Sequence, residues 1–136
     1  MNSMLLAVTA RVCGWGVFAF CLLGMVGCES ARAPVSDIES GRQLLVSSLS
    51  DWKQGVSVAA MKQKSQAVYV SEELWEQGYV LNDFKLDSEG ELYGTNVRIQ
   101  VTLQLTDKAN QKSNLAVTYL VTTTPALTIA RGDRPL

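Results

Sequence analysis

The residues of this chain that could do chemistry are few, and none is a histidine. The 136-residue sequence contains 12 Lys and Arg, 13 Asp and Glu, three Cys and no His. Without His there is no Ser-His-Asp or Cys-His catalysis, no His-ligated metal and no side chain whose ordinary pKa lies near neutrality. The polar groups that could still line a pocket are Asp83, Arg98, Tyr79, Tyr93 and Tyr119.

Asp83 is the residue that could act as a general base. It stands two residues before Lys85 in a predicted strand, so both side chains lie on one face of that strand. Lys85 would then be a solvated neighbour and not the buried partner of a base. We therefore expect a solvated ion pair at Asp83, and we expect the tyrosines to be core or rim aromatics with hydrated hydroxyl groups.

Two acidic clusters could attract a cation. One surrounds a glycine and consists of Asp87, Glu89 and Glu91. It lacks the further ligands and the distant bidentate Glu of an EF-hand, so we expect a charged turn. The other consists of Glu72, Glu73 and Glu76, which we expect on the solvated face of a short helix near its positive end. We expect no metal site, no catalytic residue and no cofactor.

Two further features have both a structural and a functional interpretation. Trp52 and Trp75 are expected to organise the core, because a buried Trp covers on the order of 200 Å²; the alternative is that Trp75 lines a ligand groove. Arg131-Gly132-Asp133 spells an adhesion tripeptide. Three residues recur easily by chance, and we expect them to belong to a frayed end after the last strand.

The elements that must position these residues begin with a helix from Ser36 to Gly55. Ser36 and Glu39 have the spacing of a capping box, and Gly55 is the expected stop. The side of this helix that should meet the core carries Ile38, Leu45, Leu49 and Trp52. Ser57 is expected to cap a second, shorter helix at residues 58–61.

The rest of the domain has the pattern of strands. We expect strands at 66–70, 79–86, 97–105, 115–121 and 126–131, and one short helix at 71–78. The strand 97–105 alternates five apolar with four polar residues, which indicates one buried and one wet face. Its buried side should pair with a row on the next strand: Leu115, Val117, Tyr119 and Val121.

This order predicts an α+β domain, in which N-terminal helices pack on a curved antiparallel sheet of four to five strands. The element order over residues 36–131 resembles the NTF2-like and cystatin-like architectures. NTF2-like enzymes hold an Asp in a pocket between helix and sheet, which the resemblance would assign to Asp83. The domain also resembles uncharacterised small lipoproteins of planctomycete-type bacteria, a group without established activity. The resemblance rests on Trp52, Trp75-Glu76-Gln77-Gly78-Tyr79 and residues 125–129.

Residues 1–27 differ from the rest of the chain. Arg11 is the one charge among them, and sixteen uncharged residues follow it. This run is shorter than the ~20 residues of a transmembrane helix, and its glycines weaken it as a helix, so it is typical of an export signal. It ends in Met25-Val26-Gly27-Cys28, which resembles the lipobox of bacterial lipoproteins.

The resemblance implies that Cys28 becomes the lipidated first residue, with an ordinary secretory signal or an uncleaved anchor as alternatives. The domains are then a signal peptide at 1–27, the lipidated Cys and a tether at 28–35, one domain at 36–131 and a loose tail at 132–136. Cys13 and Cys21 would be removed, so the mature chain would hold no disulfide. The tether would span at most about 25 Å.

The function expected from these features is that of a non-enzymatic, lipid-anchored cell-envelope protein, a binding or structural module that faces the periplasm or the exterior. Its partners would be the membrane, through the lipid anchor, and an envelope protein or a glycan. The alternative is a small-molecule binder or weak enzyme with an NTF2-like pocket between helix and sheet. A net charge of -1 provides no basic field for nucleic acid. The oligomeric state is left open.

Overall fold

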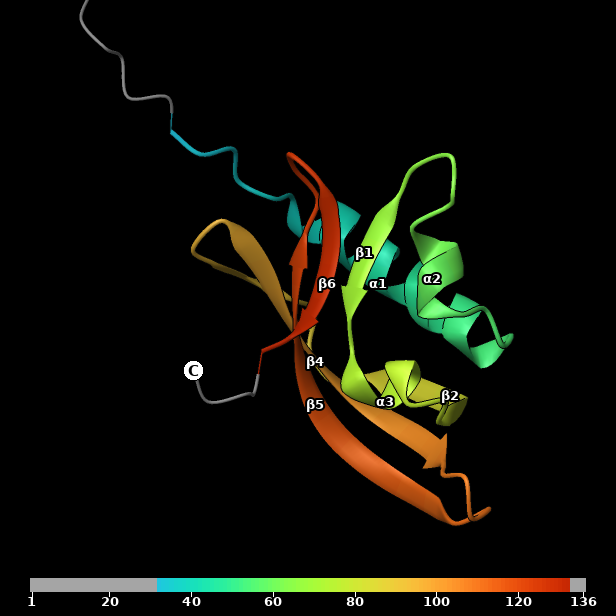
Figure 1. Ribbon diagram of the computed structural model, residues 1–136. Helices are drawn as coiled ribbons and strands as arrows, with labels where there is room; N and C mark the ends of the chain where they lie inside the picture. Colours follow the sequence, from blue (N-terminus) through green and yellow to red (C-terminus); the bar gives the residue numbers. More distant parts are fainter. Residues whose placement is uncertain (1–31, 133–136) are drawn as a thin grey trace, which may run out of the picture. The chain divides into compact units, whose positions relative to one another are not determined.

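The computed structural model describes residues 32–132, and these form one compact unit (Figure 1). The expected signal, Cys28 and residues 133–136 lie outside the described residues. The elements in chain order are α1 (Ile38–Lys53), α2 (Val58–Met61), β1 (Val68–Ser71), α3 (Glu73–Glu76), β2 (Val80–Leu86), β3 (Glu91–Tyr93), β4 (Asn96–Thr106), β5 (Lys112–Thr122) and β6 (Leu127–Arg131). The α+β class is confirmed. None of the helices in residues 32–132 has the length and apolar character needed to cross a bilayer.

The sheet is mixed and six-stranded, and the expected purely antiparallel sheet of four to five strands is wrong in that respect. Its order is β1-β6-β5-β4-β2, with β3 paired to β4. The predicted meander is confirmed as the antiparallel series β2, β4, β5 and β6. β1 adds to it in parallel beside β6, in the register Val70↔Ile129. This pairing joins segments 59 residues apart in the chain (Val70 and Ile129), which local periodicity does not reveal.

The buried face of the sheet follows the predicted period of two. On β4 the residues Val97, Ile99, Val101, Leu103 and Leu105 are almost fully buried. They form one core with Leu45, Leu49 and Trp52 of α1, around which the sheet curls (Figure 1). The facing row on β5 is buried at Val117, Tyr119 and Val121.

Two residues expected in the core are partly exposed. Leu115 is 36% exposed because β6 pairs only with residues 119–122 of β5, which leaves the first half of that strand as a free edge. Ile38 is also 36% exposed, since it lies on the first turn of α1. The core is therefore centred on the last three turns of α1.

The N-terminus of α1 differs from the predicted capping box. The N-cap is Asp37, whose carboxylate accepts a hydrogen bond from the Ser40 amide at 2.8 Å. Ser36 is buried, and its hydroxyl oxygen accepts from the Thr123 amide at 2.9 Å. Because Ser36 satisfies a donor of the β5–β6 turn, the next residue caps the helix. The stop at Gly55 and the Ser57 cap of α2 are confirmed.

A close approach of α1 to the sheet explains a glycine inside the helix. A Cβ on Gly41 would lie 2.9 Å from Val97 Cγ2. Gly within a helix lowers stability by about 1 kcal/mol relative to Ala. At position 41 this loss is accepted because only Gly allows α1 to approach β4 so closely. The contact fixes the start of α1 on the sheet.

Candidate functional site

The candidate site is built from two copies of one short pattern. Residues 52–56 read Trp-Lys-Gln-Gly-Val and residues 75–79 read Trp-Glu-Gln-Gly-Tyr. The first segment ends α1 and the second ends α3. In both, the glycine takes a positive φ, +87° at Gly55 and +86° at Gly78, where residues with a side chain are strained.

Both helix ends use the same hydrogen bonds. The Gly55 amide donates to the Trp52 carbonyl at 2.9 Å, and the Val56 amide donates to the Asp51 carbonyl at 3.0 Å. The second copy repeats this pair of bonds at 3.1 Å (Gly78 to Trp75) and 2.9 Å (Tyr79 to Leu74). These are the two bonds of a Schellman motif, so each Trp starts an identical helix end.

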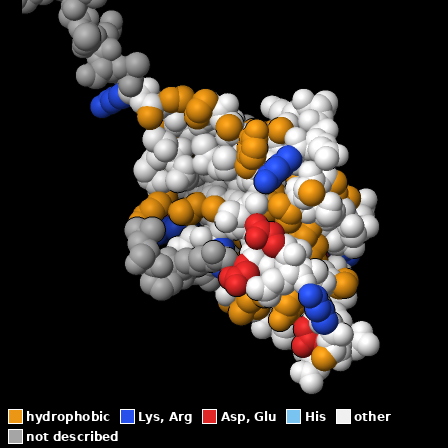
Figure 2. Space-filling view, in the orientation of Figure 1, with side chains coloured by type: hydrophobic (Ala, Val, Ile, Leu, Met, Phe, Trp, Pro, Cys, Tyr) orange, Lys and Arg blue, Asp and Glu red, His pale blue; other side chains and the backbone are white. Residues whose placement is uncertain are grey.

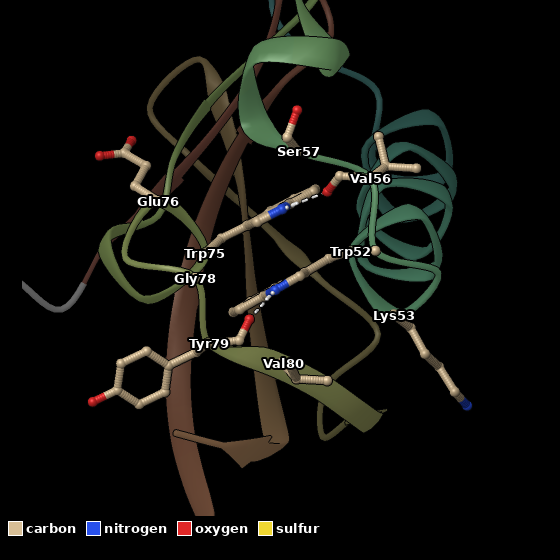
Figure 3. Close-up of a pocket in the computed structure, with 10 residues that line it drawn as sticks. Trp52, Lys53, Val56, Ser57, Trp75, Glu76, Gly78, Tyr79 and Val80 are labelled. Atoms are coloured by element: carbon tan, nitrogen blue, oxygen red, sulfur yellow. Dashed lines mark hydrogen bonds between the residues drawn. The ribbon is translucent and has the colours of Figure 1, made fainter. Parts of the chain in front are cut away.

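The two tryptophans bind each other's helix end (Figure 3). Trp52 Nε1 donates to the Tyr79 carbonyl at 2.8 Å, and Trp75 Nε1 donates to the Val56 carbonyl at 2.8 Å. Their rings are stacked, with centroids 5.1 Å apart and planes within 3°. We call this arrangement the tryptophan brace. The indoles are 3% and 6% exposed, so their predicted place in the core is confirmed.

A pocket of about 390 Å³ opens over the tryptophan brace. Its lining consists of Trp52, Lys53, Gly55, Val56, Ser57, Trp75, Glu76, Gly78, Tyr79 and Val80. In Figure 3 the side chains of Lys53 and Glu76 point away from the indoles, toward the rim. The pocket therefore has a rigid, largely apolar floor and a polar rim. Trp75 thus belongs to the core and also lines a pocket.

Asp83 is not among the residues that line this pocket. A bulge at Asn82 shifts the register of β2, so that Asp83 stands opposite Gln104 on the outer face of the sheet. Its carboxylate pairs with Lys53 Nζ at 3.1 Å, and both side chains are about half exposed. The Lys53 hydrogen bond is the main cause that lowers the pKa of Asp83. The solvated ion pair is confirmed, but its partner is Lys53 and not Lys85.

A buried polar cluster joins Glu72, Tyr119 and Arg131. The Tyr119 hydroxyl donates to Glu72 Oε2 at 2.7 Å, and Arg131 Nη2 lies 3.0 Å from Glu72 Oε1. Glu72 is 1% exposed, and its carboxylate also accepts from the Leu74 amide as the N-cap of α3. Burial, followed by the charge of Glu72, raises the pKa of Tyr119 well above its usual range.

This cluster corrects two expectations: Glu72 is not on a solvated helix face, and the Tyr119 hydroxyl is not hydrated. Arg131 is the last residue of β6, as the predicted strand 126–131 has it, so the tripeptide that it begins does not lie wholly in a frayed end. The alternation of buried and exposed residues along β1 could have predicted that Glu72 is buried, because Glu72 continues the inward-facing row of Val68 and Val70. The hydrogen bonds of these three side chains join β5, β6 and the start of α3, and none of the three lines the pocket over the tryptophan brace.

The acidic turn is divided among separate partners. Asp87 accepts from the Thr102 hydroxyl at 2.6 Å, and Glu89 pairs with Arg42. Glu91 pairs with Arg98 at 2.7 Å. Within residues 32–132, no three His, Cys, Asp or Glu side chains come together as a metal site would require.

The other two polar candidates lie away from the pocket. The Arg98 guanidinium stacks over the Tyr93 ring at 4.6 Å from its centroid, on the outer face of the hairpin formed by β3 and β4. Tyr79 contributes its carbonyl to the tryptophan brace. The structure therefore does not bring Asp83, Arg98 and the tyrosines together.

In comparisons with known proteins, no family model, no curated protein and no solved structure matches the chain.

Proposed function

We propose that this chain is a non-enzymatic, lipid-anchored cell-envelope protein that binds a protein partner through the pocket over the tryptophan brace. The observation that carries the proposal is the filled space between α1 and the sheet. Leu45, Leu49, Ile99, Val101 and Tyr119 occupy it with at most 1% of their surfaces exposed. An enzyme of this architecture would need a cavity there with a polar group inside it.

The tryptophan brace suits the pocket to binding. Its floor is held by two hydrogen bonds and a ring stack, so little conformational entropy is lost when a partner binds. Two glycines at the opening, Gly55 and Gly78, leave room for close approach of a partner. The rim offers Ser57, Lys53 and Glu76 for hydrogen bonds and charge pairs with that partner.

The class of partner follows from the burial of the Trp52 and Trp75 rings. Sugar rings bind on exposed faces of aromatic side chains, but the two indoles stack on each other and are 3% and 6% exposed. The lining favours an apolar side chain of a polypeptide, which gains about 25 cal/mol per Å² of buried apolar surface. A protein partner is thus preferred over a glycan.

The alternative is a small-molecule site of the NTF2-like type. The NTF2-like or cystatin-like assignment itself is supported by one long helix held within a curled sheet, the arrangement of α1 in Figure 1. A small-molecule function could use the same pocket of about 390 Å³ over the tryptophan brace, since the core between α1 and the sheet is filled. Such a ligand would bind without the carboxylate of Asp83.

The lipid anchor rests on Met25-Val26-Gly27-Cys28 and on the short tether that follows it. Its test is metabolic labelling with an alkyne analogue of palmitate, followed by membrane sedimentation of the full chain. The wild type should be labelled and should sediment with membranes, and Cys28→Ser should lose the label. An unlabelled wild type that is fully soluble would refute the anchor.

The binding site is tested by photocrosslinking from the native envelope. A photoreactive amino acid at Val80, an exposed residue of the pocket lining, should give one discrete adduct. Ser57→Trp, which narrows the pocket, should abolish that adduct. The control places the photoreactive residue at Gln104, which is exposed on the outer face of the sheet. The same adduct from Gln104, or an adduct that persists in Ser57→Trp, would place the partner elsewhere.

A further inference from the structure

The point where the chain enters the domain is fixed by hydrogen bonds. The Ser36 amide donates to the Thr95 carbonyl at 3.0 Å, and the Ser36 hydroxyl oxygen accepts from the Thr123 amide at 2.9 Å. Ser36 is 2% exposed. The entry point therefore lies between the β3–β4 turn and the β5–β6 turn, at one end of the long strands (Figure 1). We call this end the entry pole.

Exposed apolar side chains gather at the entry pole. Val35, Leu92 and Tyr93 are 53%, 52% and 52% exposed, and Ile38 beside them is 36% exposed. Tyr93 pairs with Asn96 at the tip of the β3–β4 hairpin, next to the contact between Thr95 and Ser36. Figure 2 shows hydrophobic side chains along the surface where the described chain begins.

The geometry of the hairpin argues for a soft apolar phase and against a second rigid surface. Leu92 and Tyr93 are successive residues of β3, so their side chains project from opposite faces of the hairpin. A rigid partner could cover one face, whereas a medium that surrounds the tip covers both. Tyr is suited to a lipid interface, because its ring can enter the apolar region while its hydroxyl group stays hydrated.

The charges of the β3–β4 hairpin and the turn before it are paired, which lowers their cost of approaching lipid. Glu91 pairs with Arg98, whose guanidinium also covers the Tyr93 ring. Glu89 pairs with Arg42. Asp37 and Glu39, at the start of α1, are exposed and accept hydrogen bonds from the Ser40 amide and from Gln43 Nε2. The contact with lipid would therefore be made chiefly by apolar groups.

We propose that the entry pole rests on the membrane surface, with Val35, Leu92 and Tyr93 in the lipid interface. This inference rests on the proposed lipidation of Cys28. The seven residues from Glu29 to Val35 span at most about 25 Å, so the pole stays near the bilayer. At the resulting high local concentration, a small apolar contact is sufficient to orient the domain.

The orientation decides where the binding pocket lies. α1 starts at the entry pole, and its 16 residues extend for about 24 Å at 1.5 Å per residue. Trp52 and the tryptophan brace lie at its far end. The pocket is thereby held away from the lipid, on the side open to a partner.

The test places a fluorophore at each end of the full chain in vesicles. Cys13 and Cys21 precede the expected processing site and Cys28 carries the lipid, so an introduced Cys would be the one reactive thiol of the mature chain. Thr95→Cys marks the entry pole and Ala109→Cys marks the β4–β5 turn at the opposite end. The vesicles contain phosphatidylethanolamine and phosphatidylglycerol, with doxyl-labelled phosphatidylcholine as the quencher. We expect quenching at Thr95→Cys and none at Ala109→Cys.

A second pair of variants isolates the apolar contact. Leu92→Ser with Tyr93→Ser should abolish quenching at Thr95→Cys. Val80→Ser with Leu115→Ser, two exposed apolar residues remote from the pole, should leave the quenching unchanged. Equal quenching at both ends, or quenching that persists without Leu92 and Tyr93, overturns the inference while an acylated Cys28 in the mass spectrum keeps the anchor. An unacylated chain that does not bind vesicles refutes the anchor, and the inference with it.

Discussion

Replacing either tryptophan of the brace by Phe should destabilise the domain through one identified hydrogen bond. Trp52→Phe keeps an aromatic ring against Trp75 but leaves the Tyr79 carbonyl without its donor at 2.8 Å. The bond is partly buried; an acceptor left without its donor and kept from water costs about 1–3 kcal/mol, and the smaller ring loses about 1 kcal/mol of apolar burial. We therefore expect a loss of about 2–4 kcal/mol, which a domain with about 5–15 kcal/mol of stability survives. Trp75→Phe should cost a similar amount through the Val56 carbonyl.

The two losses should not add. Each bond fixes the loop that follows the other tryptophan's helix, so removal of the first loosens the second. In urea unfolding, the double variant should cost less than the sum of the single variants, by about 0.5–1.5 kcal/mol. Tyr69→Phe, at a half-exposed tyrosine of β1, is the control and should change stability by less than about 0.5 kcal/mol. Strict additivity, or single losses no larger than that of the control, would refute the reciprocal brace.

Three further predictions concern the core. Leu103→Asp buries a charge at a fully buried position and should unfold the domain, whereas Gln104→Lys on the exposed face should keep it folded in a thermal melt. Gly41→Ala brings a Cβ within 2.9 Å of a valine methyl on β4 and should cost about 1–3 kcal/mol in urea unfolding; Ser47→Ala, on the exposed side of α1, should be neutral or slightly stabilising. Tyr119 should stay protonated while the domain is folded, since its pKa is raised. Its contribution to stability is therefore present below the pKa of an unfolded Tyr, about 10, and is lost as pH rises above that value. An absorbance titration that showed all four tyrosines ionising near pH 10 before unfolding would contradict this.

The elements that local patterns specify were predicted well. α1 ends before the expected Gly55, Ser57 caps α2, and the alternation of β4 places the buried face correctly. These features depend on neighbouring residues, on the preference of Gly for positive φ and on the side-chain period of a strand. They could be predicted because no distant segment alters them.

The features that were missed depend on contacts between distant segments. The Ser36 hydroxyl oxygen accepts a hydrogen bond from the Thr123 amide, 87 residues away, and Ser36 therefore does not cap the helix. Glu72 follows the inward-facing residues of β1 and precedes the acidic helix α3, so its sequence position is compatible with either a buried or an exposed side chain. It is buried because Tyr119 and Arg131, on other strands, bind its carboxylate. The pocket could not be predicted without knowing that the ends of α1 and α3 meet. The repeated pattern Trp-x-Gln-Gly was a sign in the sequence that the two helices end in the same way.

The reciprocal bonding of the tryptophan brace also has a consequence for local opening. α3 has four residues, too few to form a helix alone in water, so its persistence depends on Trp75 being held at the end of α1. Opening of either helix end breaks both indole bonds together, and the two ends form one cooperative unit. In native-state hydrogen exchange, the amides of Val56 and Tyr79, 23 residues apart in the chain, are expected to lose protection with a single free energy of opening.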